Sequence, residues 1–323
     1  MTGHHSGSSA PGERLPGVTL FVGLGRMGQP MVRRYAVAHS TLLYDVDTDV
    51  SSGLAAELGT SSLPDIAALP DDIATVILML PDSRIVESVL LGEESGQGLL
   101  GHLSPGTLVI DMGSSEPAST RRLSELASRQ ELRYVDAPVS GGVAKATTGE
   151  LSIMVGGEPE AVESAMEHLG PMGTTIVHVG PSGAGHAAKA LNNLLSATNL
   201  AAAAEVLCVA QRSGIRPEVM VEVLNSSTGR SQATEVKYPQ HILTGSFASG
   251  FEMDLMLKDL HIASDLSAEV DVSTPITAQT VETVAEARRW LGVSGLDHTE
   301  IARYYEGVNS ALLRSDINER PDE

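Results

Sequence analysis

The sequence predicts a doubly wound α/β domain with a mostly parallel sheet, followed by an all-helical domain that a long helix joins to it. Short β-branched or apolar runs alternate with helix-length segments in the first half of the chain, which is the pattern of βαβ units. That pattern stops after Gly183, where a stretch rich in Ala and Leu begins. Beyond this stretch only helical periodicity recurs.

Seven runs in the first half predict strands, because each is short, apolar and separated from the next by turn residues or a helix-length segment. They are residues 18–22, 41–44, 75–80, 108–110, 133–135, 152–155 and 175–179. A long helix is expected from about Gly183 to Ser213, since no strand signal interrupts it. Further helices are expected at about residues 217–225, 252–270, 275–291 and 298–312.

These elements divide the chain into four parts. We expect a disordered arm at residues 1–17, an α/β domain at 18–181, an all-helical domain at 182–313 and a flexible tail at 314–323. At 323 residues the chain is long enough for two domains, each with its own core.

The charge balance excludes one class of partner. The chain has 21 Lys and Arg against 41 Asp and Glu, which gives a formal net charge of −20. Nucleic acids and anionic membranes are themselves polyanions, so we expect neither as a partner. The partner expected instead is a small molecule.

The single cysteine, Cys208, excludes an intrachain disulfide and a zinc–cysteine site. It lies in an apolar helical stretch, which indicates a buried core residue. The histidines show no metal-ligand spacing, so no metal is expected. No run of 18 apolar residues is found, and the first 17 residues lack the apolar core of a signal peptide. The expected location is therefore the reducing cytoplasm.

A glycine-rich motif directly follows the first predicted strand. Gly23, Gly25 and Gly28 fit G-x-G-x-x-G, with Arg26 and Met27 before the third glycine. The first glycine allows a tight turn, the second lets the backbone approach a pyrophosphate, and the third allows close packing of helix on sheet. The N–H groups of the helix that follows would bind the phosphates. The sequence therefore predicts a Rossmann dinucleotide-binding domain at 18–181.

An acidic residue ends the second predicted strand. Asp45 follows Gly23 by 22 residues, the separation at which a carboxylate accepts hydrogen bonds from the adenosine ribose. Its charge would repel a 2′-phosphate, and neither Val46 nor Asp47 is basic. We therefore expect NAD, and NADP less. Asp47 itself is interpreted as a solvated loop charge.

Three further segments make the motif specific to a family. They are Asp-Ala-Pro-Val-Ser-Gly-Gly at residues 136–142, Gly-Ala-Gly-His-Ala-Ala-Lys-Ala-Leu-Asn-Asn at 183–193, and Phe251 through Lys258-Asp259-Leu260. Together with Gly-Leu-Gly-Arg-Met-Gly at 23–28, they resemble the β-hydroxyacid dehydrogenase family in order and in spacing. The resemblance covers the chain from about Val18 to about Leu312.

The resemblance implies an NAD-dependent oxidoreductase of the 3-hydroxyisobutyrate dehydrogenase type. It would transfer a hydride reversibly between NAD and the 3-hydroxyl carbon of a short 3-hydroxy carboxylic acid. The alternatives are a reductase of a short semialdehyde, such as tartronate or succinic semialdehyde, and an L-threonate-type dehydrogenase. An imine reductase and a non-catalytic dinucleotide-binding module are less favoured, because Lys189 is present.

Lys189 and Asn193, near the start of the long helix, are four residues apart, so their side chains project from one face of it. The resemblance implies that Lys189 is the general acid/base and that Asn193 orients the reacting oxygen, with Asn192 as a substrate-binding residue. Small or apolar neighbours flank Lys189, which is unusual for an exposed helix face. His186, at a position where relatives often carry Gln, is a further candidate for a residue that borders the site.

The resemblance also assigns the substrate carboxylate to Ser140, Gly141 and Gly142, where a hydroxyl and backbone N–H groups are available. Lys145 stands where the 3-hydroxyisobutyrate branch tends to have Gly. The form found here looks more like the threonate and related branches. Arg230, with the hydroxyls that precede it, is a second candidate for contact with the distal end of a substrate.

The remaining cofactor contacts are implied in the same way. Ser114 would lie near the nicotinamide, and Gly113 departs from the family pattern, which usually has Ser at that position. The other implied cofactor-binding residues are Leu80, Pro81, Phe251, Lys258 and Asp259.

The second domain would contribute to substrate binding and oligomerisation, and we expect a homodimer or homotetramer because its long Ala-rich helix is apolar on more than one face.

Overall fold

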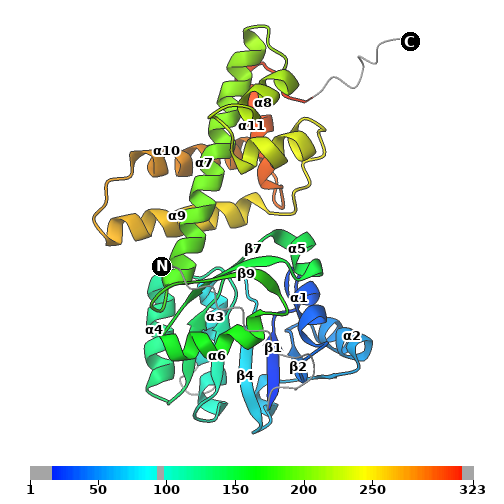
Figure 1. Cartoon of the computed structure of the whole chain (residues 1–323), viewed down its shortest axis with the longest axis vertical. Coiled ribbons are helices and arrows are strands. Elements are labelled where there is room, and N and C mark those ends of the chain that lie inside the picture. The colour runs from blue at the N-terminus through cyan, green and yellow to red at the C-terminus, as the bar shows by residue number, and fades with distance from the viewer. Residues whose placement is uncertain (1–16, 93–97, 315–323) are drawn as a thin grey trace. The chain divides into compact units, whose positions relative to one another are not determined.

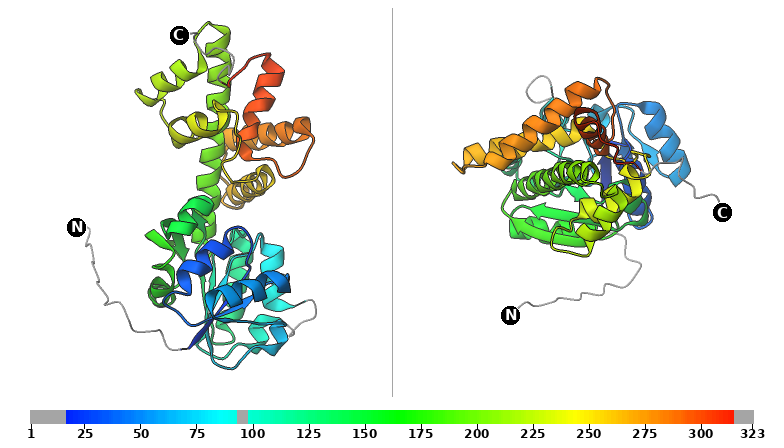
Figure 2. Two further views of the ribbon diagram at one scale, coloured as in Figure 1. Left: turned by 90° about the vertical axis from the view of Figure 1, so that its right-hand side faces the viewer. Right: turned by 90° about the horizontal axis from the view of Figure 1, so that it is seen from above.

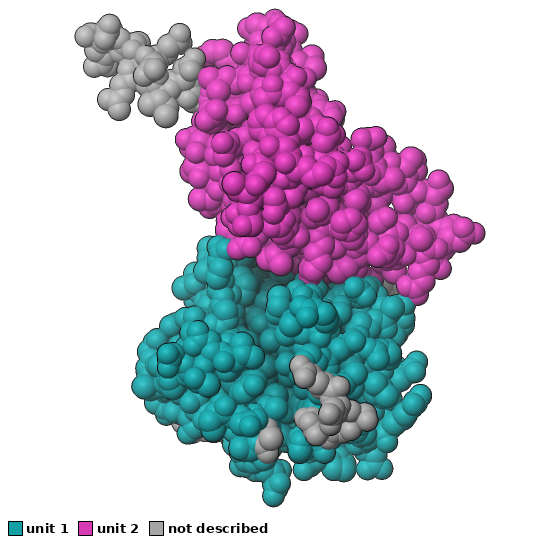
Figure 3. Space-filling view, turned by 180° about the vertical axis from the view of Figure 1, so that it is seen from behind, with its two compact units in different colours: residues 1–186 teal, residues 187–323 magenta. Residues whose placement is uncertain are grey.

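The computed structural model describes residues 17–92 and 98–314. The expected arm at 1–17 and tail at 314–323 lie outside these residues, apart from Gly17 and Arg314. The chain divides into two compact units, Met1–His186 and Ala187–Glu323, which Figure 3 shows in different colours. Each unit has a hydrophobic core of its own.

Unit 1 is built on a nine-stranded sheet (Figure 1). Its first six strands are parallel and lie in the order β3-β2-β1-β4-β5-β6, the order of a Rossmann fold. Strand β8 pairs antiparallel with β6 and β7, and parallel with β9. The mostly parallel sheet is therefore confirmed. The strands are β1 (Val18–Val22), β2 (Thr41–Tyr44), β3 (Ser61–Ser62), β4 (Ile73–Leu78), β5 (Leu108–Asp111), β6 (Arg133–Asp136), β7 (Val139–Ser140), β8 (Leu151–Gly156) and β9 (Gly173–Gly180).

Both faces of this sheet are covered by helices. Strand β1 shows how its residues serve both layers, since successive side chains of a strand point to opposite faces. Phe21 packs in the core that includes α1, α2 and α6, whereas Leu20 and Val22 pack in the core that includes α3 and α4. The helices are α1 (Gly28–Tyr35), α2 (Thr48–Leu58), α3 (Ser83–Leu91), α4 (Pro117–Ser128), α5 (Gly142–Thr148) and α6 (Pro159–Leu169), with short 3₁₀ turns η1 (Ile66–Ala68) and η2 (Leu99–His102).

Among the described residues of unit 2, the regular elements are helices joined by loops (Figure 2). Its core includes one side of the long helix α7 (Ala184–Arg212), where Leu200, Ala204 and Leu207 recur every three or four residues. Cys208 is buried in the same core, as expected. The other helices are α8 (Pro217–Asn225), η3 (Ala233–Ile242), α9 (Met253–Glu269), α10 (Pro275–Leu291), η4 (His298–Glu300) and α11 (Ile301–Asn309).

One helix of unit 2 was not expected from the sequence. Residues Ala233–Ile242 form a π-helix, the wider winding with i→i+5 hydrogen bonds, and Pro239 lies inside it. Proline lacks an N–H and its ring clashes with the preceding turn of an α-helix, so the α-helical pattern is broken here. Tyr238 anchors the segment, because it is fully buried and its hydroxyl donates to the carbonyl of Leu200 on α7 at 2.8 Å.

Helix α7 is long and apolar enough to cross a membrane by length and composition alone. The sequence analysis expected this helix but did not identify it as long and apolar enough to span a membrane, because it required an unbroken apolar run. An 18-residue window of this alanine-rich helix nevertheless reaches a mean hydropathy of 1.4. Half of that window is buried inside the protein, which is typical of a helix in the core of a domain.

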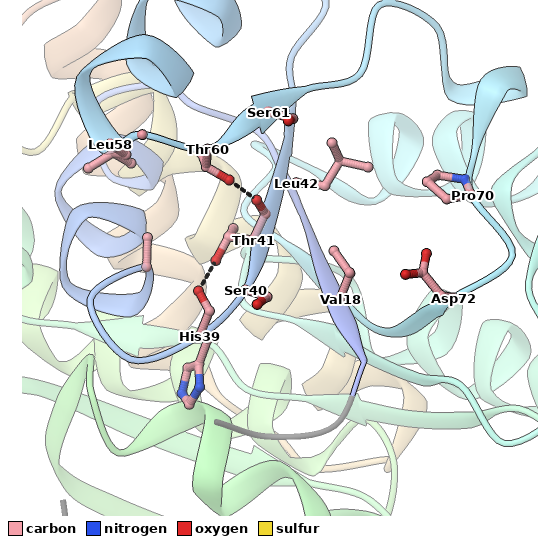
Figure 4. A pocket seen from close by; sticks show the side chains of 12 residues that line it. Val18, His39, Ser40, Thr41, Leu42, Leu58, Thr60, Ser61, Pro70 and Asp72 are labelled. Atoms are coloured by element: carbon pink, nitrogen blue, oxygen red, sulfur yellow. Dashed lines mark hydrogen bonds between the residues drawn. The ribbon is translucent and has the colours of Figure 1, made fainter. Parts of the chain in front are cut away.

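A hollow in the surface of unit 1 lies where β1 and β2 begin (Figure 4). Val18, His39, Thr41 and Thr60 are among the residues that line it. The Thr41 hydroxyl donates to the carbonyl of His39 at 2.9 Å, and the Thr60 hydroxyl donates to the carbonyl of Thr41. Ligands of such sheets bind at the opposite, carboxyl ends of the strands, so we place the candidate site there.

Candidate active site

The glycines of the first motif meet three different steric demands. Gly23 has a φ of +93°, and a Cβ there would lie 2.4 Å from the carbonyl oxygen of Met79. A Cβ on Gly28 would lie 1.9 Å from the carbonyl oxygen of Gly23. A Cβ on Gly25, by contrast, would have no atom of the described residues within 4 Å beyond its own neighbours. Packing therefore explains the first and third glycines, and open space at the second fits the approach of a phosphate.

The beginning of α1 is suited to an anion. No side chain caps the helix at Met27, and there is no acidic residue in its first turn. Its first N–H groups therefore have no side-chain acceptor at the cap, and they lie at the positive end of the helix. Met27 is partly buried against the core and Arg26 is exposed. The residues present fit the pyrophosphate of a dinucleotide.

The Asp45 carboxylate is tied to this loop. It accepts a hydrogen bond from the N–H of Leu24 at 2.6 Å and another from the N–H of Asp47 at 2.9 Å. These bonds fix the carboxylate beside the glycine turn at the end of β2. Asp47 is exposed, but it is more than a loop charge, because it caps α2 by accepting from the N–H groups of Asp49 and Val50.

The next two strands end in a close backbone contact. Gly113 follows β5, and a Cβ there would lie 2.5 Å from the carbonyl oxygen of Leu80, which follows β4. A serine at this position would need the backbone to shift, which gives a physical reason for the departure from the family pattern. Leu80 and Ser114 are half-buried and Pro81 is exposed.

Two fully buried carboxylates lie at the ends of β5 and β6, and sequence reasoning gave them no role. Asp111 accepts from the N–H of Gly113 at 3.0 Å and from the hydroxyl of Ser115 at 3.0 Å. Asp136 accepts from the N–H of Gly183 at 2.8 Å and of His186 at 2.9 Å. An acidic residue at the end of a buried strand is the signal that could have found them.

His186 lies between these two carboxylates. Its Nε2 is 3.9 Å from Asp111 and its Nδ1 is 3.9 Å from Asp136. The Nδ1 is also hydrogen-bonded to the Thr120 hydroxyl at 2.7 Å, and the whole side chain is buried. These contacts hold the buried His186 side chain at the beginning of α7, which indicates a structural role.

The predicted carboxylate-binding residues form an exposed turn. Ser140 ends β7, Gly141 caps α5 with a φ of +134°, and Gly142 begins the helix with a φ of +66°. The side chain of Lys145 lies over Gly141, since a Cβ there would meet it at 2.6 Å. Nothing among the described residues lies within 4 Å of the Cβ position of Gly142. The turn thus leaves space for a ligand next to its backbone.

In unit 2, α7 brings Lys189 and Asn193 onto one face. Asn193 is buried, and its amide donates to a carboxylate oxygen of Asp259 at 2.5 Å. The other oxygen of Asp259 lies 3.3 Å from the ammonium of Lys258. Asp259 is itself buried, so the pair is more than a surface charge pair. The chain of contacts fixes the orientation of the Asn193 amide.

Burial lowers the pKa of Lys189 from its ordinary value. The carboxylate of Asp259 opposes this shift, and the ammonium of Lys258 adds to it. A lysine with a lowered pKa is suited to exchange a proton with a substrate hydroxyl. Asn192 is exposed, and its amide donates to Asn193 at 3.3 Å.

A second lysine lies near this face and was missed by sequence reasoning. The ammonium of Lys237, on the π-helix, donates to the Ser196 hydroxyl of α7 at 2.9 Å. Burial lowers the pKa of Lys237 to about 8, with Asp297 opposing the shift and Lys189 adding to it. The only sequence signal is a lysine between Val236 and Tyr238 in a stretch without helical periodicity. Arg230, the candidate from the sequence, is exposed.

Phe251 lies in the same unit, next to a polar cluster. Its carbonyl accepts from the N–H of His298 at 2.9 Å, and the two rings meet edge to face at 5.4 Å. The Ser249 hydroxyl donates to both oxygens of Asp297, at 2.8 and 2.9 Å. Burial lowers the pKa of His298 to about 4, so His298 is neutral at physiological pH.

Comparison with known families covers both units. Residues 19–180 match the family described as the NAD binding domain of 6-phosphogluconate dehydrogenase. Residues 183–305 match the family described as NAD-binding of NADP-dependent 3-hydroxyisobutyrate dehydrogenase.

Individual relatives match over most of their own length. The chain is 37% identical to 2-(hydroxymethyl)glutarate dehydrogenase of Eubacterium barkeri over 91% of this chain and 96% of that protein. It is 36% identical to an NAD-dependent L-serine dehydrogenase of Pseudomonas aeruginosa over 79% and 87%. Among solved structures, 3-hydroxyisobutyrate dehydrogenase of Mycobacterium tuberculosis with L-serine has a TM-score of 0.81 at 29% identity, over 90% of this chain and 99% of that one.

Proposed function

This chain belongs to the β-hydroxyacid dehydrogenase family, and we propose that it transfers a hydride reversibly between NAD and the 3-hydroxyl carbon of a short 3-hydroxy carboxylic acid. Membership makes it an NAD(P)-dependent oxidoreductase that acts on hydroxyl donors. The observation that carries the finer proposal is the buried Asn193 amide, which Asp259 holds on the same helix face as Lys189. The matching reverse reaction is the reduction of a short semialdehyde.

In the proposed oxidation, the neutral amine of Lys189 accepts the proton of the substrate hydroxyl. Asn193 holds the same oxygen through its amide, so that the carbon-bound hydrogen is correctly oriented. The C–H electron pair leaves as a hydride while the C–O bond becomes a carbonyl. In the reverse direction the ammonium of Lys189 returns the proton to the oxygen. The lowered pKa of Lys189 supports both roles.

The chemistry that a nicotinamide cofactor supplies when bound is the acceptance and return of the hydride. The residues that would hold it are Gly23, Gly25 and Gly28 at the pyrophosphate and Asp45 at the adenosine ribose. We further propose that the half-buried Ser114 lies near the nicotinamide, and that Lys258 and Phe251 contribute to its binding. The substrate carboxylate is assigned to Ser140 and the N–H groups of Gly141 and Gly142.

The reaction class is tested by steady-state kinetics on a panel of short 3-hydroxyacids and the corresponding semialdehydes, with NAD and NADP. Turnover of at least one 3-hydroxyacid, with stoichiometric formation of NADH or NADPH, supports the proposal. No turnover of any member by a folded enzyme that binds the cofactor would contradict it.

Asp45 should set the coenzyme preference, because its carboxylate repels a 2′-phosphate. The Asp45→Asn variant keeps one acceptor oxygen for Leu24 and loses the charge, so the ratio of kcat/KM for NAD to that for NADP should fall about tenfold or more. Asp47→Asn, which neutralises the neighbouring exposed carboxylate, is the matched control and should leave the ratio within about twofold. A wild-type preference for NADP would refute the charge argument.

We also propose a homodimer or homotetramer in the cytoplasm, formed through an apolar stripe on α7. Leu195 and Val209 are 62% and 66% exposed, and they continue one face with Leu191, Ala202 and Val206. Light scattering at micromolar concentration should give at least twice the chain mass of 33.8 kDa. Val209→Glu should shift the population towards the single chain, because association would bury the new charge. A wild type of only 33.8 kDa would exclude the assembly.

A further inference from the structure

Lys237 is held in place by two contacts with α7. The neighbouring Tyr238 is fully buried and bonded to the carbonyl of Leu200, which fixes the π-helix against α7. The ammonium of Lys237 then reaches the hydroxyl of Ser196 at 2.9 Å. A lysine side chain is long and flexible, so a hydrogen bond at its end costs conformational entropy. The position of this cation is therefore specified by its surroundings.

Ser196 places this cation on the helix face already assigned to the reaction. Lys189, Asn193 and Ser196 are spaced i, i+4 and i+7, which is one face of an α-helix. The backbone positions of Lys189 and Ser196 are about 10 Å apart along the helix axis. Burial lowers the pKa of Lys237, and the charge of Lys189 lowers it further. One face of α7 thus carries the ammonium of Lys189 and, at Ser196, contacts the ammonium of Lys237.

The surroundings of Lys237 do not neutralise it. Within residues 17–92 and 98–314, no carboxylate oxygen lies within the 4 Å of an ion pair with its ammonium. Asp297 is the nearby acid, but its oxygens accept from Ser249, from the N–H of Gly250 and from Thr299. Of the groups nearby, His298 is held neutral, because burial lowers its pKa.

A structural role alone does not explain a cation at this position. A partly buried ammonium without a carboxylate partner is costly, whereas an apolar side chain of the same length would pack there without that cost. A second like charge nearby makes the arrangement less favourable still. An anion from outside the chain would remove both penalties.

We propose that Lys237 determines substrate specificity by binding a second carboxylate, so that the substrate is a 3-hydroxy dicarboxylic acid. This proposal rests on the proposed function, because it takes the reacting hydroxyl to lie at Lys189 and Asn193. This second carboxylate lies at the distal end of the substrate chain and meets the ammonium of Lys237 beside Ser196.

The test compares two substrates that differ only at the distal end. 2-(Hydroxymethyl)pentanedioate carries a terminal carboxylate where 2-(hydroxymethyl)pentanoate carries a methyl group. The wild type should prefer the dicarboxylate in kcat/KM. In Lys237→Met the ratio of the two kcat/KM values should fall roughly 10- to 100-fold, the scale of a lost charge-assisted hydrogen bond, and mainly through the KM of the dicarboxylate.

Two further variants serve as matched controls. Lys237→Arg keeps the charge and should retain most of the preference, whereas Ser196→Ala removes only the hydroxyl that orients the ammonium and should reduce it by less than Lys237→Met does. Circular dichroism and thermal melting establish that each variant is folded. A ratio that is unchanged in folded Lys237→Met, or a wild type that prefers the monocarboxylate, overturns the proposal.

A binding measurement separates this proposal from the proposed function. Isothermal titration of each compound into the enzyme with bound NADH should show tighter binding of the dicarboxylate to the wild type, and Lys237→Met should abolish the difference. If neither compound is turned over but this difference is found, the reaction is wrong and the role of Lys237 stands. If turnover is found without any difference in binding or in the kcat/KM ratio, the role of Lys237 is wrong.

Discussion

The Lys189→Ala variant should turn over its 3-hydroxyacid roughly 10²–10⁴ times more slowly than the wild type, the usual effect of removing a general acid/base. The loss should fall on kcat, because the hydroxyl proton then has no acceptor in the transition state. Fluorescence titration with NADH should give nearly the same affinity, since Lys189 contacts the reacting oxygen in the proposal. Arg212→Ala, which removes an exposed cation from the end of the same helix, is the control and should keep wild-type turnover.

The pH profile gives an independent test of the same residue. Oxidation needs the neutral amine, so its rate should rise from neutral to alkaline pH. Burial lowers the pKa of Lys189, so the rise should end below the pH of about 10.4 at which an unperturbed lysine titrates. The profile should flatten in Lys189→Ala. A wild-type rate that stays constant from about pH 6 to 10, with the chemical step rate-limiting, would remove Lys189 from the role of base.

The Asp136→Ala variant should lose about 3 kcal/mol of unfolding free energy. Its two oxygens accept from the N–H groups of Gly183 and His186, and an unsatisfied buried donor costs about 1–3 kcal/mol. Relief of repulsion with the buried Asp111, which lies across His186, offsets part of the loss. Urea unfolding followed by fluorescence and circular dichroism should show the lower midpoint.

Asp136→Asn is the graded control for this effect. It keeps the shape of the side chain and one acceptor oxygen, so it should lose less than Asp136→Ala. If the alanine variant is as stable as the wild type within about 0.5 kcal/mol, the carboxylate does not hold the beginning of α7.

The sequence predicted those elements whose signal lies in neighbouring residues. A parallel strand buried on both faces is a short unbroken apolar run, as β4 and β5 show. Each of the seven expected runs overlaps a strand, including the run in β9, which is largely exposed. Helices α8 and α10 have the expected bounds, because Pro217 and Pro275 lie in their first turns. The two-residue strands β3 and β7 were not expected, since two residues cannot show a periodicity.

The contacts that could not be predicted depend on residues far apart in the chain. The glycine motif is local, so its steric demands could be anticipated. Asn193 and Asp259 are 66 residues apart, and only the folded helices of unit 2 show that they are hydrogen-bonded. Lys237 and Ser196 are 41 residues apart, and the π-helix that joins them has no sequence periodicity that marks it. The sequence therefore predicted Lys189 and Asn193 as reacting residues, but it did not predict the groups that contact them.

The π-helix has a consequence for how substrate selection changes by insertion and deletion. Its winding takes more residues per turn than an α-helix, so removal of one residue after Tyr238, with the π winding kept, would rotate the C-terminal part by one residue's share of a turn. Such a deletion would move Ile242 out of the core and leave Lys237 attached to the anchor at Tyr238. The same deletion before Lys237 would instead displace Ala233 and Thr234. Length changes on the two sides of Tyr238 thus alter different parts of the unit, and the cation that faces α7 is retained through both.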